Sequence, residues 1–286
     1  NEIWKKSWEA NSYEDFYSIV TTENDEYIVV GNTMSTNLPD IEYKGGYYDA
    51  IIVKYDDNGD IVWMKGYGGN EYDEYRDVIY DDGSIVAVGY SNSTNLSNLS
   101  VGSDAAAIVI KYDLNGNIVW EKKWDGNSYD IFRKILKFDK EYLICGYTLS
   151  TNHAGLEIPV EKSKYNVSIV KMDKNGNVIF QNDWGGNGSD SIRDFVVTNY
   201  NKILMIASSN STDLDDIELT TSTNIIIKLL YKYNFNNLSS INGSFISEQK
   251  DNLGIINPLP DNGYEVDKII IKDGLGNNIT SNKQEN

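Results

Sequence analysis

A motif that returns at a fixed spacing constrains this chain more than any other feature of its sequence. A segment of the form I-V-K-Y-D-x-N-G-x-I-V-W occurs, with small changes, at residues 52–63, 109–120 and 169–180. A second motif, N-x-Y-[DE], begins at Asn11, Asn70 and Asn127 and continues in altered form at Asn187. Both motifs return after about 58 residues. Such a period indicates repeated supersecondary units of one kind.

Each repeat contains four short segments typical of β-strands. In the first repeat these are residues 16–21, 27–30, 50–55 and 60–65, separated by polar turns and one longer polar stretch. The Asn58-Gly59 pair between the last two segments favours a tight hairpin. No segment has an apolar period of 3.6 residues over helical length. The sequence therefore predicts an all-β fold, a β-propeller of about four blades with four antiparallel strands each.

The two ends of the repeat region predict how such a ring closes. The fourth repeat lacks the Asp-x-Asn-Gly turn and the outer strand that carries Trp63, Trp120 or Phe180 in the other repeats. Residues 3–8, Ile-Trp-Lys-Lys-Ser-Trp, match that outer strand. We therefore expect the N-terminal strand to pair with residues 224–228 and to close the ring, because closure removes exposed sheet edges.

Three motifs resemble those of a known family. Residues 66–73, Gly-Tyr-Gly-Gly-Asn-Glu-Tyr-Asp, precede Asp82-Gly83, and residues 31–39 and 146–151 carry the pattern Gly-x-Thr-x-Ser-Thr. Over about residues 2–230 the chain resembles the bacterial seven-bladed β-propeller repeat family. The resemblance implies the fold but no shared catalytic residues. The count of about four repeats departs from the number in the family's name, which implies a small ring or part of a larger assembly.

Residues 236–286 carry a different pattern. The Trp and N-x-Y-D motifs stop, and residues 254–279 are similar to a small β repeat of Gram-positive surface proteins. We expect a propeller over residues 1–235 and a small β module, truncated or packed on the propeller, over 236–286, since about 50 residues is marginal for a free-standing core. A degenerate fifth blade is the alternative, because residues 269–272 and 276–278 match the third strand of a blade and its turn.

The charge of the chain limits its partners. Of the 286 residues, 25 are Lys or Arg and 43 are Asp or Glu, which gives a net charge of −18. A surface this acidic repels nucleic acid and anionic membranes. The apolar runs are also too short to span a bilayer. We therefore expect no nucleic-acid partner and no membrane insertion, and we expect a monomer.

Residues that usually carry catalysis are scarce. His153 is the single histidine and lies in a polar stretch, and Cys145 is the single cysteine and lies in an apolar strand. The Asp56-x-Asn58-Gly-Asp60 turn lacks the glutamate that completes a calcium loop. Acidic residues are too many for the sequence to nominate one catalytic pair. We therefore expect no enzyme activity, no catalytic residue, no metal site and no cofactor.

The N-x-Y-D motif has two interpretations. It is either a structural turn at the start of the innermost strand, with its tyrosine packed between blades, or part of a binding rim. In a four-stranded blade these turns share one face with the long loops between the second and third strands, and binding residues usually lie on such loops. The candidate ligand-binding residues around the channel mouth are Tyr13, Glu14, Tyr72, Asp73, Tyr129, Asp130 and Asp190.

Three functions fit these features. The first is a non-catalytic bacterial binding module, extracellular or on the cell surface, such as an adhesin or a glycan-recognition domain, because tyrosine rings and carboxylates suit sugars. A host or surface protein, or a cationic peptide attracted by the carboxylates, is the competing ligand. The second is a structural spacer in a long surface protein. The third, with least support in the sequence, is a polysaccharide hydrolase or lyase.

Overall fold

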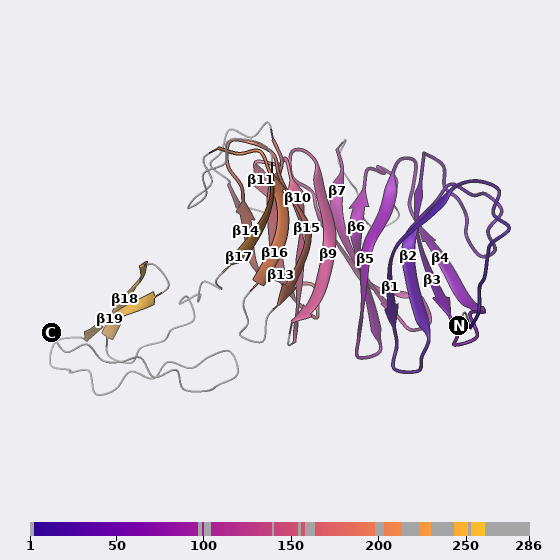
Figure 1. Cartoon of the computed structure of the whole chain (residues 1–286), viewed down its shortest axis with the longest axis horizontal. Helices are drawn as coiled ribbons and strands as arrows, with labels where there is room; N and C mark the ends of the chain where they lie inside the picture. Colours follow the sequence, from indigo (N-terminus) through magenta and orange to yellow (C-terminus); the bar gives the residue numbers. More distant parts are fainter. Residues whose placement is uncertain are drawn as a thin grey trace. The chain divides into compact units, whose positions relative to one another are not determined.

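Four β-sheets that follow one another in chain order make up the repeat region (Figure 1). This computed structural model describes residues 3–96, 99, 104–138, 140–153, 156–157, 164–197, 203–212, 223–229, 243–250 and 253–260. These residues form strands, turns and loops, and no helix among them is long and apolar enough to cross a membrane. The predicted all-β fold is confirmed.

The first two sheets each contain four antiparallel strands in chain order. The first consists of β1 (Glu14–Thr21), β2 (Tyr27–Thr33), β3 (Asp49–Tyr55) and β4 (Ile61–Tyr67). The second consists of β5 (Asp73–Asp81), β6 (Ser84–Ser91), β7 (Ala106–Asp113) and β8 (Ile118–Trp124). Each sheet is the four-stranded meander of a propeller blade, as the repeat predicts.

The third and fourth sheets continue the pattern. The third consists of β9 (Asp130–Phe138), β10 (Glu141–Thr148), β13 (Asn166–Asp173) and β14 (Val178–Trp184). Between β10 and β13, the short strands β11 (Asn152–His153) and β12 (Leu156–Glu157) pair with each other. The fourth sheet has three strands among the described residues, β15 (Asp190–Val197), β16 (Ile203–Ser209) and β17 (Thr223–Leu229).

The core lies between neighbouring sheets, which explains why a strand such as β3 is apolar along most of its length and buried throughout. Ile52 packs in one cluster with Ile85 and Ile108 of the second sheet. Val53 points to the opposite side of β3 and packs with Met64. Each fully buried isoleucine or valine contributes about 2 kcal/mol to stability, so both sides of a sheet contribute to the core.

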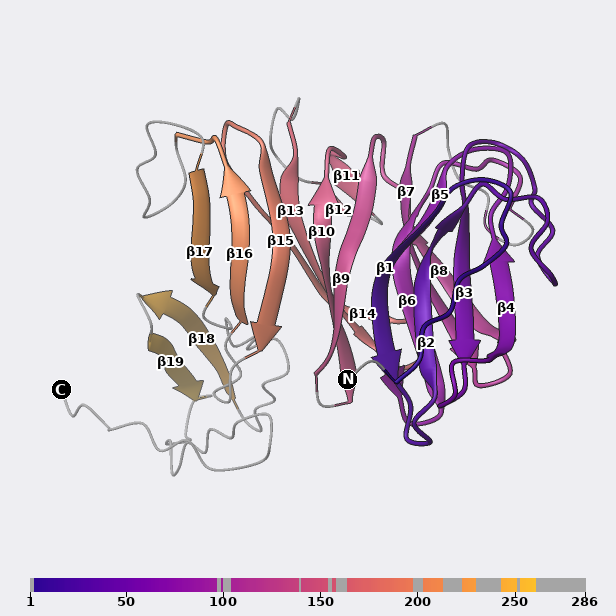
Figure 2. The ribbon, with the colours of Figure 1, turned by 45° about the vertical axis from the view of Figure 1, so that its right-hand side comes forward.

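The first strands of the four sheets, β1, β5, β9 and β15, contact one another in that order and are called the inner strands below (Figures 1 and 2). The pairing register of each is interrupted by one extra residue, a β-bulge, at Tyr17, Arg76, Arg133 and Arg193 respectively. Opposite the second bulge, a Cβ on Gly89 would overlap the carbonyl oxygen of Glu74. This close approach explains why glycine occupies this position in the first three repeats; the fourth has Ala207 there.

The Asp-x-Asn-Gly segments form the predicted hairpin turns between the third and fourth strands. Gly59, Gly116 and Gly176 have φ angles of 75°, 80° and 82°, which favour glycine over other residues. In the second turn the Asp113 carboxylate accepts hydrogen bonds from the backbone N–H groups of residues 115 and 117, at 2.9 and 2.8 Å. The aspartate thus fixes its own turn.

The N-terminal segment does not close a ring. Residues 3–10 form no strand, and β17 pairs with β16 alone among the described strands. The first and fourth sheets lie at opposite ends of the row in Figures 1 and 2. The expected pairing of residues 3–8 with 224–228 is therefore wrong. The physical reason is that this segment finds its partners on the first sheet, where Trp8 packs against the apolar cluster around Val53.

Trp4 nevertheless occupies the place of an outer-strand tryptophan. Trp63 donates a hydrogen bond from its indole N–H to the carbonyl of Leu114 at 3.0 Å, in the hairpin turn of the next sheet. Trp4 donates in the same way to the carbonyl of Asp57, at 3.2 Å. Trp4 thus makes the contact typical of an outer-strand tryptophan, although residues 3–8 form no strand.

The chain divides into two compact units, Asn1–Leu229 and Leu230–Asn286. In the second unit, β18 (Gly243–Lys250) and β19 (Leu253–Pro260) form an antiparallel pair. Residues 269–272 and 276–278, on which the alternative of a fifth blade depends, lie outside the described residues.

Candidate functional site

The aspartate of the N-x-Y-D motif anchors two loops at once. The Asp73 side chain lies at the start of β5 and is fully buried. Its Oδ2 accepts hydrogen bonds from the Gly69 N–H at 2.9 Å and from the Ser93 hydroxyl at 2.6 Å, and its Oδ1 accepts one from the Ser91 hydroxyl. One carboxylate thus ties the turn before β5 to the loop after β6. This link explains why the N-x-Y-D motif and the serine- and threonine-containing segment after the second strand of a sheet recur together in the sequence.

The same anchor occurs in later repeats. The donors to Asp130 are the Gly126 N–H at 2.9 Å, Thr148 Oγ1 at 2.6 Å and Ser150 Oγ at 2.8 Å. The donors to Asp190 are the Gly186 N–H at 3.0 Å and Ser211 Oγ at 2.8 Å. Because buried polar groups are stable only when they are paired, these aspartates hold the loop face in one conformation.

The asparagine of the motif adds a second clamp. The Asn70 Oδ1 accepts a hydrogen bond from the Thr94 N–H at 3.1 Å. In the third repeat Asn127 Oδ1 accepts one from the Thr151 N–H at 2.8 Å. The Asn and Ser-Thr motifs are therefore parts of one local structure, although they lie about 24 residues apart in the chain.

The three aspartates of the N-x-Y-D motif are too deeply buried to contact a ligand at the expected site. Asp73, Asp130 and Asp190 are only 0 to 2% exposed, and their carboxylates are bonded within the loops. Glu14 is half-buried, and its Oε1 accepts hydrogen bonds from Thr33 and Ser35. These four acids therefore have a structural role, which the turn interpretation of the motif predicts and the rim interpretation does not.

The tyrosines of the motif lie nearer the surface than its acids. Tyr13 is 50% exposed and Tyr129 is 41% exposed, whereas Tyr72 is half-buried. The ring of Tyr72 stacks on that of Tyr47, with centroids 4.4 Å apart and ring planes within 5° of parallel. Tyr47 is itself 53% exposed, so the stack leaves aromatic surface open to solvent.

Tyr48 joins this stack to Tyr13. Its ring centroid lies 5.6 Å from that of Tyr72 and 6.2 Å from that of Tyr13. Tyr13, Tyr47, Tyr48 and Tyr72 are called the tyrosine cluster below. Tyr47 and Tyr48 lie on one of the long loops that the sequence predicts, but neither was among the expected ligand-binding residues. The available signal was the adjacent tyrosine pair directly before β3, on a loop expected to share a face with the N-x-Y-D turns.

The third and fourth sheets meet with fewer aromatic residues at the corresponding place. Tyr165 packs edge-on against Tyr147, with ring centroids 4.9 Å apart. The fourth copy of the motif, residues 187–190, has a serine at the position of Tyr72. The repeats therefore differ in aromatic content at this place, and the four-tyrosine arrangement is found where the first and second sheets meet.

Two carboxylates are buried side by side beneath the tyrosine cluster. Asp49 and Asp73 both lie against Gly68. Burial, together with the nearby charge of Asp73, raises the pKa of Asp49 to about 7, although the Lys44 N–H donates a hydrogen bond to it at 2.8 Å. Burial also raises the pKa of Asp73 to about 6. A pair of acids in this environment favours protonation near neutral pH.

A polar network lies beside the cluster on the inner strands. Glu74 forms an ion pair with Arg76 and accepts a hydrogen bond from Asn32 Nδ2 at 3.1 Å. The Arg76 guanidinium lies over the ring of Tyr17, 4.5 Å from its centroid. Burial and the charge of Glu74 raise the pKa of Tyr17 to about 12, so its hydroxyl stays protonated at neutral pH. Tyr13 connects this network to the tyrosine cluster, because its hydroxyl and that of Tyr17 both donate to Asp15.

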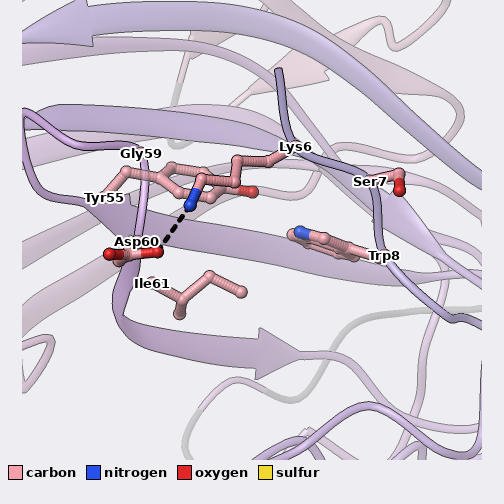
Figure 3. Close-up of a pocket in the computed structure, with 7 residues that line it drawn as sticks. All are labelled: Lys6, Ser7, Trp8, Tyr55, Gly59, Asp60 and Ile61. Atoms are coloured by element: carbon pink, nitrogen blue, oxygen red, sulfur yellow. Dashed lines mark hydrogen bonds and ion pairs between the residues drawn. The ribbon is translucent and has the colours of Figure 1, made fainter. Parts of the chain in front are cut away.

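A shallow pocket of about 170 Å³ lies where the N-terminal segment rests on the first sheet (Figure 3). Its lining residues are Lys6, Ser7, Trp8, Tyr55, Gly59, Asp60 and Ile61. The charged groups of the pocket, Lys6 and Asp60, pair with each other at 2.6 Å. We therefore assign this pocket to the packing of the N-terminal segment rather than to ligand binding.

No family model matches the chain, so the resemblance to the propeller repeat family stays a prediction. No curated protein matches it either. Among solved structures, two substitution mutants of levansucrase from B. megaterium are similar to it, with identities of 10% and 11% and TM-scores of 0.35 and 0.36. The matches cover 87% and 88% of this chain and 68% and 69% of the levansucrase chains. At these values the likeness bears on neither the site nor the activity of this chain.

Proposed function

We propose that this chain is a non-catalytic module, secreted or displayed on a bacterial cell surface, that binds a glycan through the tyrosine cluster. The observation that carries the proposal is a set of packed, partly exposed tyrosine rings on a face whose loops are fixed by buried carboxylates. Tyrosine offers a sugar an apolar ring face and a hydroxyl that donates and accepts hydrogen bonds.

The loops beneath the cluster are ordered before any ligand arrives. Asp73 bonds the turn that carries Tyr72, and the Asp73 N–H donates to the carbonyl of Tyr48 at 2.8 Å. Little backbone freedom therefore remains to be lost on binding, which favours affinity. The tyrosines themselves have only two rotatable side-chain bonds and lose little entropy.

Binding without turnover is supported by the state of the reactive groups. Cys145 is buried, and burial raises the pKa of its thiol well above the usual value, which disfavours the reactive thiolate. The acids of the N-x-Y-D motif are engaged by loop hydroxyls rather than presented at the surface. The same proposal includes a monomeric state and no nucleic-acid partner.

The test is binding to an array of bacterial and host glycans by the full chain and by single alanine variants. Tyr47→Ala and Tyr72→Ala should each weaken binding about tenfold or more. Their melting temperatures should stay within about 2 °C of the parent, because neither side chain is fully buried. Phe180→Ala is the matched control, since Phe180 is an exposed aromatic residue of β14 outside the cluster.

Each alternative function gives a different result in this assay. Retention of no glycan at any concentration would favour a structural spacer. Release of sugar from a polysaccharide would favour a hydrolase or lyase. Binding of a cationic peptide that weakens sharply with added salt would favour a protein ligand, because a neutral glycan on tyrosine rings is insensitive to ionic strength.

A further inference from the structure

The arginines of this protein all occupy one position of the repeat. The sequence contains three, Arg76, Arg133 and Arg193, and its other basic side chains are lysines and a single histidine. Each arginine is the bulged residue of its inner strand, on β5, β9 and β15. Arginine and lysine are not interchangeable, because only the planar guanidinium binds a carboxylate or sulfate through two parallel hydrogen bonds.

The three arginines lie at one level on neighbouring strands. The residues directly after the bulges contact one another from strand to strand, and this row of contacts is called the ladder below. It begins with a hydrogen bond from the Ser18 hydroxyl to Asp77 at 2.6 Å. Lys134 continues the ladder, with its Nζ 3.6 Å from Asp77 and 3.9 Å from Asp194. Because the ladder aligns these strands, the bulged residues directly before it also form one row.

The two ends of this row differ in charge. Glu74 neutralises Arg76, but the corresponding residues are Ile131 on β9 and Ser191 on β15. Within the part of the chain that the structure describes, neither Arg133 nor Arg193 has a carboxylate partner.

Arg133 is half-buried, and an aromatic ring rather than a carboxylate orients its guanidinium. Arg133 lies over the ring of Tyr147, 5.0 Å from its centroid, which orients the group without neutralising it. Its Nε is buried and has no hydrogen-bond partner. Arg193 is exposed, and the nearby Asp194 faces Lys134.

We infer that Arg133 and Arg193 form an anion subsite that takes the carboxylate or sulfate group of an acidic saccharide. This inference rests on the proposed glycan-binding function and specifies its ligand class. The row of bulged residues begins at Tyr17, which contacts both Arg76 and the Asp15 carboxylate that Tyr13 also contacts. A saccharide bound on the tyrosine cluster can therefore extend along the inner strands to the unpaired guanidiniums.

The first experiment observes the arginines directly. With three arginines in the chain, an ¹⁵N–¹H spectrum contains three Nε–Hε signals. Titration with glucuronate or glucose 6-sulfate should shift the signals of Arg133 and Arg193 more than that of Arg76. Methyl glucoside, and sodium acetate at the same ionic strength, are the neutral and the non-sugar controls. An absence of shifts with both acidic sugars, or equal shifts with acetate, would overturn the inference.

The second experiment measures affinity for a matched pair of oligosaccharides, one neutral and one with a uronic acid. Arg193→Gln should reduce the preference for the acidic member about tenfold, and Arg193→Lys should restore only part of it. Arg193 is exposed, so these variants should fold normally. Lys5→Gln removes one positive charge at an exposed position and should leave the preference unchanged.

The two experiments separate this inference from the proposed function. Arginine signals that shift with glucuronate, in a protein that retains no glycan on the array, would support the anion subsite and contradict glycan binding by the cluster. Glycan binding that depends on Tyr72 but shows no preference for the acidic member would support the proposed function and contradict the subsite. In 0.5 M salt the acidic preference should fall while the neutral binding remains, since only the former depends on charge.

Discussion

The junction between the first and second sheets and the junction between the third and fourth share a backbone design. In both, an aspartate at the start of the inner strand binds the hydroxyl of a loop serine, Ser93 for Asp73 and Ser211 for Asp190. In both, the N–H of this aspartate donates to a tyrosine carbonyl of the preceding sheet, at 2.8 Å for Tyr48 and 2.7 Å for Tyr165. These contacts fix the loops and leave other positions free to vary.

The two junctions differ in charge and in aromatic content. Beside Gly68 the first junction buries Asp49 together with Asp73, whereas beside Gly185 the other places Asn166 next to its aspartate. The first junction also carries the tyrosine cluster. One scaffold thus supports two local chemistries. The shared residues explain stability, and the differing residues indicate where binding is specific.

The largest effect on stability is expected from substitution of the buried aspartate that both junctions share. Asp73→Ala and Asp190→Ala should each lower the free energy of unfolding by about 3 kcal/mol, because each leaves buried hydroxyl and N–H donors without an acceptor. Urea unfolding followed by tryptophan fluorescence measures the change. Glu42→Ala, which removes an exposed carboxylate, serves as the control and should change stability by less than about 0.5 kcal/mol. A loss below 1 kcal/mol in both aspartate variants would contradict the anchoring role.

A smaller, pH-dependent effect is expected where the junctions differ. Asp49 has a pKa of about 7 in the folded protein, against about 3.9 in the unfolded chain. Folding therefore favours the protonated form, so stability falls as the pH rises from about 4 to about 7, and the full penalty is present above pH 7. Asp49→Asn should raise the free energy of unfolding by about 1–3 kcal/mol at pH 8 and by clearly less at pH 5, where only part of the penalty is present.

The reverse substitution at the other junction tests the same comparison. Asn166→Asp places a second carboxylate beside Asp190. The free energy of unfolding of this variant should fall between pH 5 and pH 8, and the neutral Asn166 of the parent protein makes no such contribution. Unfolding curves at both pH values, in one buffer series, measure both variants. If Asp49→Asn stabilises the protein equally at pH 5 and pH 8, its effect is one of packing rather than of charge.

The blade architecture was predictable because its determinants are local and repeated. The strand segments and the Asn-Gly turn at residues 58–59 are each fixed by a few adjacent residues, and three copies show the same pattern. Ring closure was not predictable. The match between Trp4 and Trp63 specifies a contact with the turn of the following sheet, and that contact forms whether or not the segment also pairs with a preceding sheet.

The site was predictable only in part. The sequence located the face and the tyrosines Tyr13 and Tyr72, but it could not separate a carboxylate that binds a ligand from one that binds its own loop, because Asp73 finds Ser91 and Ser93 only after folding. Tyr47 belongs to the cluster because its ring stacks on Tyr72 of the next sheet, and no local sequence pattern indicates a contact between two sheets.

The smallest effect is expected at the N-terminal segment. There Trp4 contacts the hairpin turn of the first sheet as Trp63 contacts that of the second, but Trp4 does not belong to a sheet. Trp4 is 40% exposed and makes one indole hydrogen bond, so Trp4→Ala should cost about 1 kcal/mol, less than Trp63→Ala, which also removes packing from the core between the first two sheets. Trp4→Phe should retain the part that comes from the ring. Thermal unfolding and gel filtration measure both properties of each variant. A strand that closed a ring would behave differently, since its loss would expose two sheet edges. A Trp4→Ala protein that melted far below the parent or formed oligomers would therefore support ring closure by this segment and contradict its docking on the first sheet.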